Sequence, residues 1–315
     1  GWHYGFGAAG IGMLFGVIQF YKSRIYLGKA GMPENPVNKK QKIKLLISAL
    51  LIIGFFIWFI SLYSKSISFV KISEVTTYII LFTAFSFFVY ILIWGNLNKE
   101  ERDRVWVLIA LFIGASMFWS GFEQAGSSLN LFATRYTQLE FSWITLYSSW
   151  FQSINSIFII IFAPIFAYLW IWLAKRNLNP STPTKFAVGL LFLALGFLMM
   201  VIASTVITTG SKAMPTWLLL TYLFHTFGEL ALSPVGLSAT TKLAPKRFVG
   251  QMMGLWFVAS ALGNLIAGRI AGEFDANNIA GFPSQYLDIV MTTAGAGIML
   301  LILSKPLQKR MRGTE

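Results

Sequence analysis

The sequence contains no cysteine, few charged residues and only two histidines, His3 and His225. The absence of cysteine excludes disulfides and thiolate metal sites, so cysteine usage gives no information about the redox compartment. The motifs HExxH, GxSxG and GxxxxGK are also absent, which removes the usual zinc, acyl-transfer and phosphate-binding sites. We therefore expect neither an enzyme nor a metal or organic cofactor.

Charged residues make up only 12% of the 315 residues, whereas 56% are hydrophobic and mean hydropathy is +0.66. A soluble domain carries about 25% charged residues. Uncharged runs of about 20 apolar residues can span a hydrocarbon core about 30 Å thick. The sequence predicts an all-α polytopic membrane protein with nine such helices, over residues 4–21, 45–64, 76–95, 105–126, 150–173, 186–207, 216–238, 250–268 and 288–304.

The net charge of +13 follows the predicted loops. Of the 25 Lys and Arg residues, 20 lie in the first loop, in alternate loops after it and in the tail, which places these segments on the cytoplasmic side. The other side holds Lys65, Lys71, Arg135, Lys212 and Arg269. This asymmetry predicts a cytoplasmic C-terminus. It accounts for the positive charge through topology and contact with the lipid bilayer, without nucleic acid as a partner.

The start of the sequence predicts that helices precede it. Gly1 is not methionine, and an apolar helix follows directly, without the charged segment or cleavage site of a signal peptide. An odd number of crossings also leaves the first helix without a partner before it. We therefore expect a fragment of a larger protein.

Two carboxylates, Glu123 and Glu229, lie inside the predicted membrane helices, and Asp288 lies at the edge of another. A charged side chain at mid-membrane costs at least about 2.5–3.5 kcal/mol, so it needs a function or a partner. No Lys or Arg lies at that depth. Each carboxylate is therefore protonated, paired with a cationic ligand, or paired with a cation outside this chain, and alternation among these states would bind and release protons.

Around Glu229, helical spacing places Thr221, His225 and Ser233 on the same face, and Pro234 predicts a local bend. Around Glu123, the same spacing places Trp119 and Ser127 on one face. Simple structural alternatives remain open for these residues. His225 could be a core histidine, Trp119 could be a packing residue, and Ser233 could bond a neighbouring helix.

Three stretches, FWSGFEQAGSSLNLFA (118–133), WFQSINSIFIIIFAPIFAYLW (150–170) and GELALSPVGLSATTKLAP (228–245), resemble the proton-dependent oligopeptide transporter (POT) family of the major facilitator superfamily. A fourth, GWHYGFGAAGIGML (1–14), is similar to the sixth core helix of that family. The resemblance covers nearly the whole chain.

The resemblance implies a bacterial inner membrane, because bacterial members of the family carry two extra helices between the halves. It also implies a domain arrangement, with the first five helices of the family missing. It implies core helix 6 at 1–21, a cytoplasmic linker at 22–44, an extra helix hairpin between the bundles at 45–95, a C-terminal six-helix bundle at 105–304 and a cytoplasmic tail at 305–315.

The resemblance also implies the site residues. Glu229 is expected to receive the amino terminus of a peptide, and Asn155 to contact the same end. Glu123 is expected to pair with a basic residue of the missing first helix and to act in proton coupling and gating. Four further residues are expected to line the side-chain pocket: Trp119, Phe122, Ser233 and Trp256.

Two departures from the family pattern bear on these roles. Ser156 stands where a proline is usual, and the first-helix motif ExxERFxYY is absent, so we do not expect this chain to transport alone. The expected function is proton-coupled uptake of di- and tripeptides, with protons and the missing N-terminal bundle as partners. A related transporter of nitrate or a drug-like amine, and a non-transporting scaffold, are the alternatives.

Overall fold

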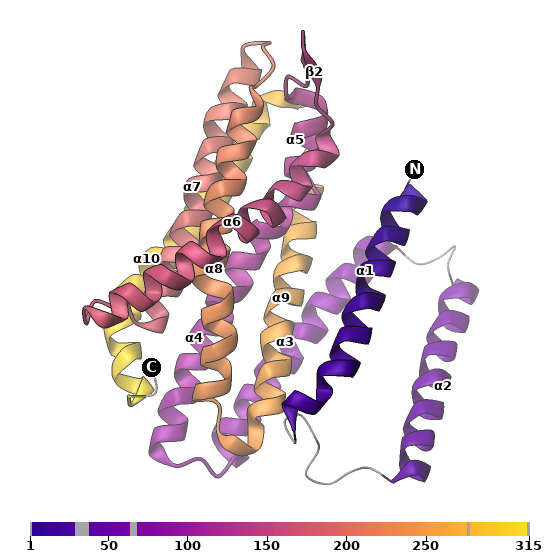
Figure 1. Ribbon diagram of the computed structural model, residues 1–315, viewed down its shortest axis with the longest axis vertical. Coiled ribbons are helices and arrows are strands. Elements are labelled where there is room, and N and C mark those ends of the chain that lie inside the picture. Colours follow the sequence, from indigo (N-terminus) through magenta and orange to yellow (C-terminus); the bar gives the residue numbers. More distant parts are fainter. Residues whose placement is uncertain (1, 29–37, 64–67, 276–277, 314–315) are drawn as a thin grey trace. The chain divides into compact units, whose positions relative to one another are not determined.

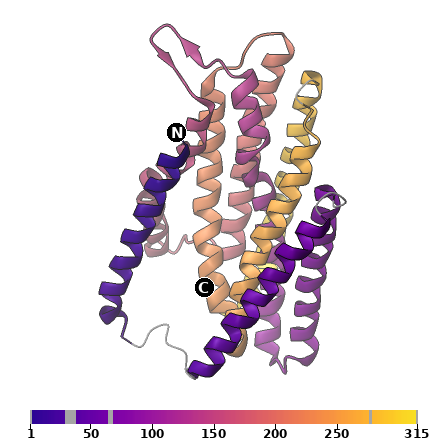
Figure 2. The same ribbon diagram turned by 90° about the vertical axis from the view of Figure 1, so that its right-hand side faces the viewer.

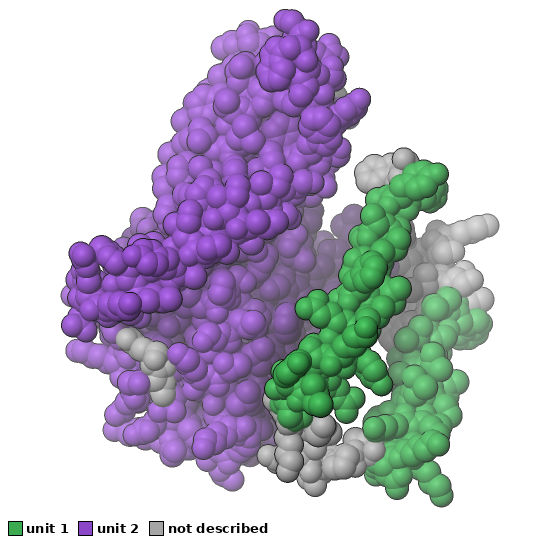
Figure 3. All heavy atoms as spheres, viewed as in Figure 1, with its two compact units in different colours: residues 1–68 green, residues 69–315 purple. Residues whose placement is uncertain are grey.

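The computed structural model describes residues 2–28, 38–63, 68–275 and 278–313, in two compact units, residues 1–68 and 69–315 (Figure 3). Residues 29–37 of the predicted linker and Lys65 lie outside the described residues. The division between the units separates the two helices of the predicted hairpin at 45–95, so that hairpin stays a prediction.

The first unit contains α1 (Trp2–Ser23), a 3-10 turn (Arg24–Leu27) and α2 (Lys39–Tyr63). Apolar side chains such as Phe15 and Ile47 are exposed along both helices. Such surfaces suit contact with lipid or with other transmembrane helices.

The second unit contains seven long helices, one short helix and a hairpin (Figure 1). These elements are α3 (Phe69–Trp94), α4 (Lys99–Phe122), α5 (Ser128–Tyr136), β1 (Glu140–Phe141), β2 (Ile144–Thr145), α6 (Ser148–Lys175), α7 (Thr182–Thr208), α8 (Pro215–Leu243), α9 (Val249–Gly272) and α10 (Phe282–Met311). The described residues thus form nine long helices, where nine crossings were predicted. Eight helical segments of the described chain are long and apolar enough to cross a membrane, and α2 is not among them.

The core of the second unit lies among α4, α7, α8, α9 and α10. Helix α7 packs against α8 and α10, and α4 packs against α9 and α10. Helix α6 crosses α8 obliquely and contributes few buried side chains (Figure 1). The bundle therefore presents α6 and one side of α8 as a partly exposed surface.

Local sequence explains where several helices begin. Asn98 accepts a hydrogen bond from the backbone N–H of Glu101, whose side chain bonds the backbone N–H of Asn98 in return, and this capping box starts α4. Pro183, Pro215 and Pro283 lie in the first turns of α7, α8 and α10, where a missing N–H costs nothing.

Helices α7 and α8 touch through their backbones at Gly189 and Gly228. A Cβ on Gly228 would lie 2.7 Å from the Gly189 carbonyl oxygen, and one on Gly189 would lie 2.9 Å from the Gly228 oxygen. Only glycine permits this approach, which is typical of closely packed transmembrane helices.

The connections that follow α5 and α7 lie at the same end of the bundle (Figure 2), and backbone hydrogen bonds join them. Ala213, between α7 and α8, donates its N–H to Tyr136 O (2.9 Å) and accepts one from Gln138 N (2.8 Å). At the opposite end, Arg312 donates two hydrogen bonds to Asp103 Oδ2, at 2.6 and 3.1 Å. These contacts hold both ends of α4–α5 in place.

Candidate functional site

The central carboxylate of α8, Glu229, is half-buried and faces α6. Its Oε2 accepts a hydrogen bond from Asn155 Nδ2 at 3.1 Å. Asn155 comes from the first half of the exposed helix α6, so the crossing of α6 over α8 brings together two residues 74 positions apart. The structure therefore joins the two residues that were predicted to receive the same end of a ligand.

Thr226 fixes the orientation of the Asn155 amide. The Thr226 hydroxyl donates to Tyr222 O at 2.7 Å, which leaves its oxygen to accept from Asn155 Nδ2 at 3.2 Å. Both amide hydrogens of Asn155 are thus used. In the described part of the chain, no donor reaches Asn155 Oδ1 or Glu229 Oε1, so both acceptors are available to a ligand.

The other carboxylate, Glu123, lies where α4 stops. The α-helix ends at Phe122, and residues Glu123–Gly126 form a 3-10 turn before α5 begins at Ser128. The prediction that Trp119, Glu123 and Ser127 share one helix face is therefore wrong for Ser127. The change from α-helix to 3-10 turn alters the direction of the residues after Glu123 relative to α4. The Glu123 side chain is exposed.

Gln124 holds this break in place and was not among the predicted site residues. It is fully buried and donates from Nε2 to Ala267 O of α9 at 3.0 Å. Its Oε1 accepts from the Ser128 hydroxyl at 2.7 Å. The sequence signal was a lone glutamine in an apolar run, followed closely by two serines.

Aromatic rings connect α4 with α8 near the two carboxylates. Trp119 lies edge-on to Phe122 at 5.3 Å between centroids, and the Phe122 and His225 rings lie 6.3 Å apart. A Cβ at Gly263 of α9 would lie 2.5 Å from Trp119 Cβ, so α9 packs directly behind this indole. That Trp119 and Phe122 line the side-chain pocket stays a prediction.

His225 faces the core rather than the Glu229 side of α8. It is 1% exposed and lies 4.8 Å from Phe197 of α7, between ring centroids. Residues four apart on a helix differ by about 40° in direction, which is enough for His225 to face α7 while Glu229 faces α6. The core interpretation of His225 fits this packing.

The last two predicted residues lie toward the other end of α8. Ser233 is half-buried one turn beyond Glu229, and α8 continues as a helix through Pro234 without interruption. Trp256 of α9 is 7% exposed and packs against Gly236 and Phe186. Gly236 lies about 10 Å along α8 from Glu229, so the structure does not bring Trp256 to the Asn155–Glu229 pair. A binding role for Trp256 stays a prediction.

Neither carboxylate has a cationic partner in the described part of the chain. Four arginines, Arg104, Arg247, Arg269 and Arg312, form ion pairs there, each with a carboxylate other than Glu123 and Glu229. The site thus combines two carboxylates, an oriented amide and an aromatic wall, which suits a ligand with a cationic end and an apolar body.

The chain is similar in sequence to known membrane transporters. The model of the POT family (PTR2) matches residues 1–285. The chain is 37% identical, over all of its length, to "Peptide transporter YePEPT" of Yersinia enterocolitica, and 31% identical, over 98% of its length, to a "Di-/tripeptide transporter" of Lactococcus lactis subsp. cremoris. It covers 64% and 63% of these relatives.

A solved structure has the same fold. A crystal structure of a peptide transporter POT in complex with sulfate superposes with a TM-score of 0.83 at 33% identity. The match covers 99% of this chain and 63% of that one. The chain therefore spans less than two thirds of the length of the proteins it resembles.

Proposed function

The chain belongs to the POT family, and on this basis we propose that it contributes the C-terminal part of a proton-coupled transporter of di- and tripeptides. The observation that carries the proposal is the Asn155–Glu229 pair, which offers two acceptors beside an apolar wall. The remaining part of the site, including the cations for a peptide carboxylate, would come from the N-terminal bundle.

The chemistry of the pair fits the amino terminus of a peptide. The α-amino group has a pKa of about 7.7–8.0 and is a cation with three donors at neutral pH. In a partly dehydrated site it needs an anion and further acceptors to offset its lost hydration. Glu229 supplies the anion and Asn155 Oδ1 supplies a second acceptor, while Asn155 Nδ2 keeps the carboxylate in one orientation.

Glu123 fits a different task, the exchange of protons. It is exposed, it has no cationic partner within the described residues, and it lies at a break between two helices. A basic residue of the N-terminal bundle would pair with it in one state of the transport cycle and leave it in another. Protonation of Glu123 would accompany the loss of that partner.

A drug-like amine is the second candidate substrate, because the same two acceptors would hold any primary ammonium. An anion such as nitrate fits poorly, because it would meet the Glu229 carboxylate. A free dipeptide and a simple alkylamine, compared as competitors, would separate the two cationic substrates.

The test uses the full-length protein reconstituted in liposomes. With an inward proton gradient, a radiolabelled dipeptide should accumulate above its external concentration, and an uncoupler should abolish the accumulation. A dipeptide with an acetylated amino terminus should compete poorly. Accumulation that is equal with and without the gradient would overturn proton coupling, and equal competition by both peptides would overturn the assigned role of Glu229.

We also propose that the protein is a multi-pass bacterial inner-membrane protein with a cytoplasmic C-terminus. Single cysteines at positions 178 and 138 should be labelled by an impermeant reagent from opposite sides, 178 from the cytoplasm and 138 from outside. Labelling of both positions from the same side would contradict this topology.

A further inference from the structure

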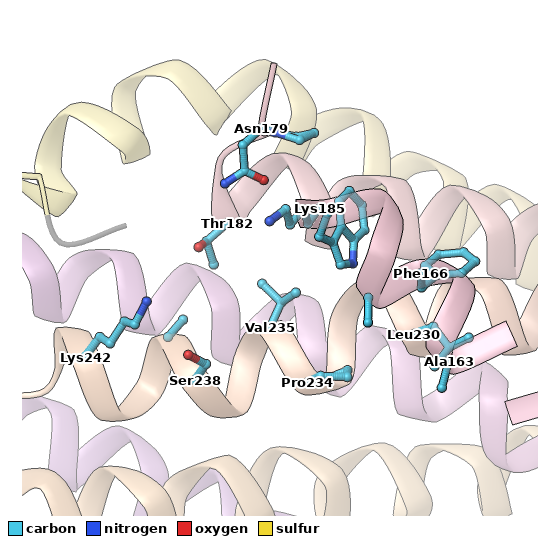
Figure 4. A pocket seen from close by; sticks show the side chains of 14 residues that line it. Ala163, Phe166, Asn179, Thr182, Lys185, Leu230, Pro234, Val235, Ser238 and Lys242 are labelled. Atoms are coloured by element: carbon cyan, nitrogen blue, oxygen red, sulfur yellow. The ribbon is translucent and has the colours of Figure 1, made fainter. Parts of the chain in front are cut away.

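A cavity lies between α6, the start of α7 and the second half of α8 (Figure 4). Its volume is about 450 Å³. It is lined by Ala163, Phe166, Ala167, Trp170, Asn179, Pro180, Thr182, Lys185, Leu230, Pro234, Val235, Ser238, Ala239 and Lys242. None of these residues belongs to the proposed peptide site.

One end of this cavity is polar and basic. Figure 4 shows Lys185 and Lys242 at that end, with Asn179, Thr182 and Ser238 around them. The Lys185 ammonium lies 4.6 Å from the centre of the Trp170 ring. Two ammonium groups with amide and hydroxyl donors nearby form a site for an anion with several oxygens, such as a phosphate diester.

The other end is apolar, and Ala163, Phe166 and Leu230 line it (Figure 4). The whole cavity, from Leu230 to Lys242, follows α8 for about 18 Å. One leaflet of the hydrocarbon core is about 15 Å deep. A basic head region that continues into an apolar groove, over the depth of one leaflet, matches a phospholipid better than a free phosphate.

The local charge favours an anionic lipid. Residues 161–185 and 230–248 contain six Lys or Arg and no Asp or Glu. The same end of the bundle carries the excess positive charge predicted to face the cytoplasm, where anionic lipids attract basic groups. Trp170 beside Lys185 also fits the interfacial position that tryptophan prefers.

We propose that this cavity binds an anionic phospholipid, with its phosphate between Lys185 and Lys242 and one acyl chain along α8. The bound lipid would fill the space between α6 and α8, and α6 carries Asn155. The cavity is thus a lipid site separate from the transported solute.

The experiment measures retention of phosphatidylglycerol and phosphatidylcholine by the delipidated full-length protein, using native mass spectrometry. A single Lys near an anionic surface contributes about a 5-fold change in binding. Lys185→Gln and Lys242→Gln should each weaken phosphatidylglycerol binding by about 5-fold, and the double variant by about 30-fold. Phosphatidylcholine should bind more weakly than phosphatidylglycerol to the wild type and should be little affected by either substitution.

Lys175→Gln is the matched control, because it removes a cation from the same end of α6 without lining the cavity. Equal losses in Lys175→Gln and in the two cavity variants would overturn the site in favour of diffuse surface charge. Thermal unfolding of each variant shows whether it is folded.

Ala167→Phe tests the apolar groove while both lysines remain. It should weaken phosphatidylglycerol binding, and unchanged binding would overturn the groove as the seat of the acyl chain. Competition by inorganic phosphate at the affinity of the lipid would show a soluble phosphate site instead. Displacement of the lipid by a dipeptide would assign the cavity to the peptide site.

Discussion

The two intramembrane carboxylates are the same residue type in opposite settings. Glu229 lies within an unbroken helix, half-buried, with its oxygen held by Asn155 at 3.1 Å. Glu123 lies where a helix ends, exposed and without a partner in the described chain. A carboxylate that must hold a ligand needs a fixed direction, whereas one that must exchange protons needs access and a partner that can leave.

Neighbouring residues create this difference. Asn155 and Thr226 orient Glu229 directly through a short chain of hydrogen bonds. Gln124 acts instead on the backbone next to Glu123, because it anchors the 3-10 turn to α9 and α5. The comparison therefore predicts that peptide affinity depends on the first group and proton coupling on the second.

Glu229→Gln should give the largest loss of affinity. It keeps the shape of the side chain but removes the charge, and hydrogen bonds to charged groups are worth about 1.5–3 kcal/mol. The full-length transporter should bind a free dipeptide about 10- to 150-fold more weakly, as measured by equilibrium binding in detergent.

The acetylated dipeptide is the control for this variant. It lacks the ammonium group, so it should bind the wild type poorly and be almost indifferent to the substitution. Equal losses of affinity for the free and acetylated peptides would assign Glu229 a structural role. Its contrast with Glu123 as a ligand-binding carboxylate would then be wrong.

Gln124→Leu should mainly destabilise the protein. It leaves the Ser128 hydroxyl and the Ala267 carbonyl without their buried partner, at a cost of about 1–3 kcal/mol. The apparent melting temperature in detergent should fall, while that of Gln152→Leu, an exposed change on α6, should barely move. Similar melting temperatures for both variants would show that Gln124 does not hold the break.

Asn155→Ala should have a smaller effect on affinity. It frees the Glu229 carboxylate to rotate and removes one acceptor, and an ordinary hydrogen bond contributes about 0.5–1.5 kcal/mol. Free dipeptide should bind about 2- to 10-fold more weakly. Ser156→Ala, an exposed neighbour on the same turn, is the matched control and should bind like the wild type.

Glu123→Gln should change affinity least, by less than about 2-fold, because this side chain has no part in the Asn155–Glu229 pair. It should nevertheless abolish uphill accumulation of dipeptide under a proton gradient, while exchange of labelled for unlabelled peptide continues. Full uphill uptake would show that Glu123 does not act in proton coupling. A large loss of affinity would show that Glu123 also takes part in peptide binding.

The sequence predicted the helices well, because apolar runs of about 20 residues have one solution in a bilayer. It did not predict the break at Glu123. That break depends on the bond of Gln124 to Ala267, which lies 143 residues away. The short hairpin Glu140–Thr145 was missed as well, since four strand residues give too little pattern.

The site was predicted in part. Motif resemblance selected both Asn155 and Glu229, and the crossing of α6 over α8 places them in contact. Trp256 was expected to line a pocket, and this stays a prediction; in the structure its indole fills a space that Gly236 leaves on α8. Sequence spacing can show that a tryptophan lies at membrane depth, but the residue it meets comes from another helix.

The contact between Gly189 and Gly228 packs α7 and α8 against each other backbone to backbone. Gly228 directly precedes Glu229, so the carboxylate is attached at the point where the two backbones approach most closely for packing. We therefore expect any rearrangement of the bundle to carry α7, α8 and Glu229 together as one body.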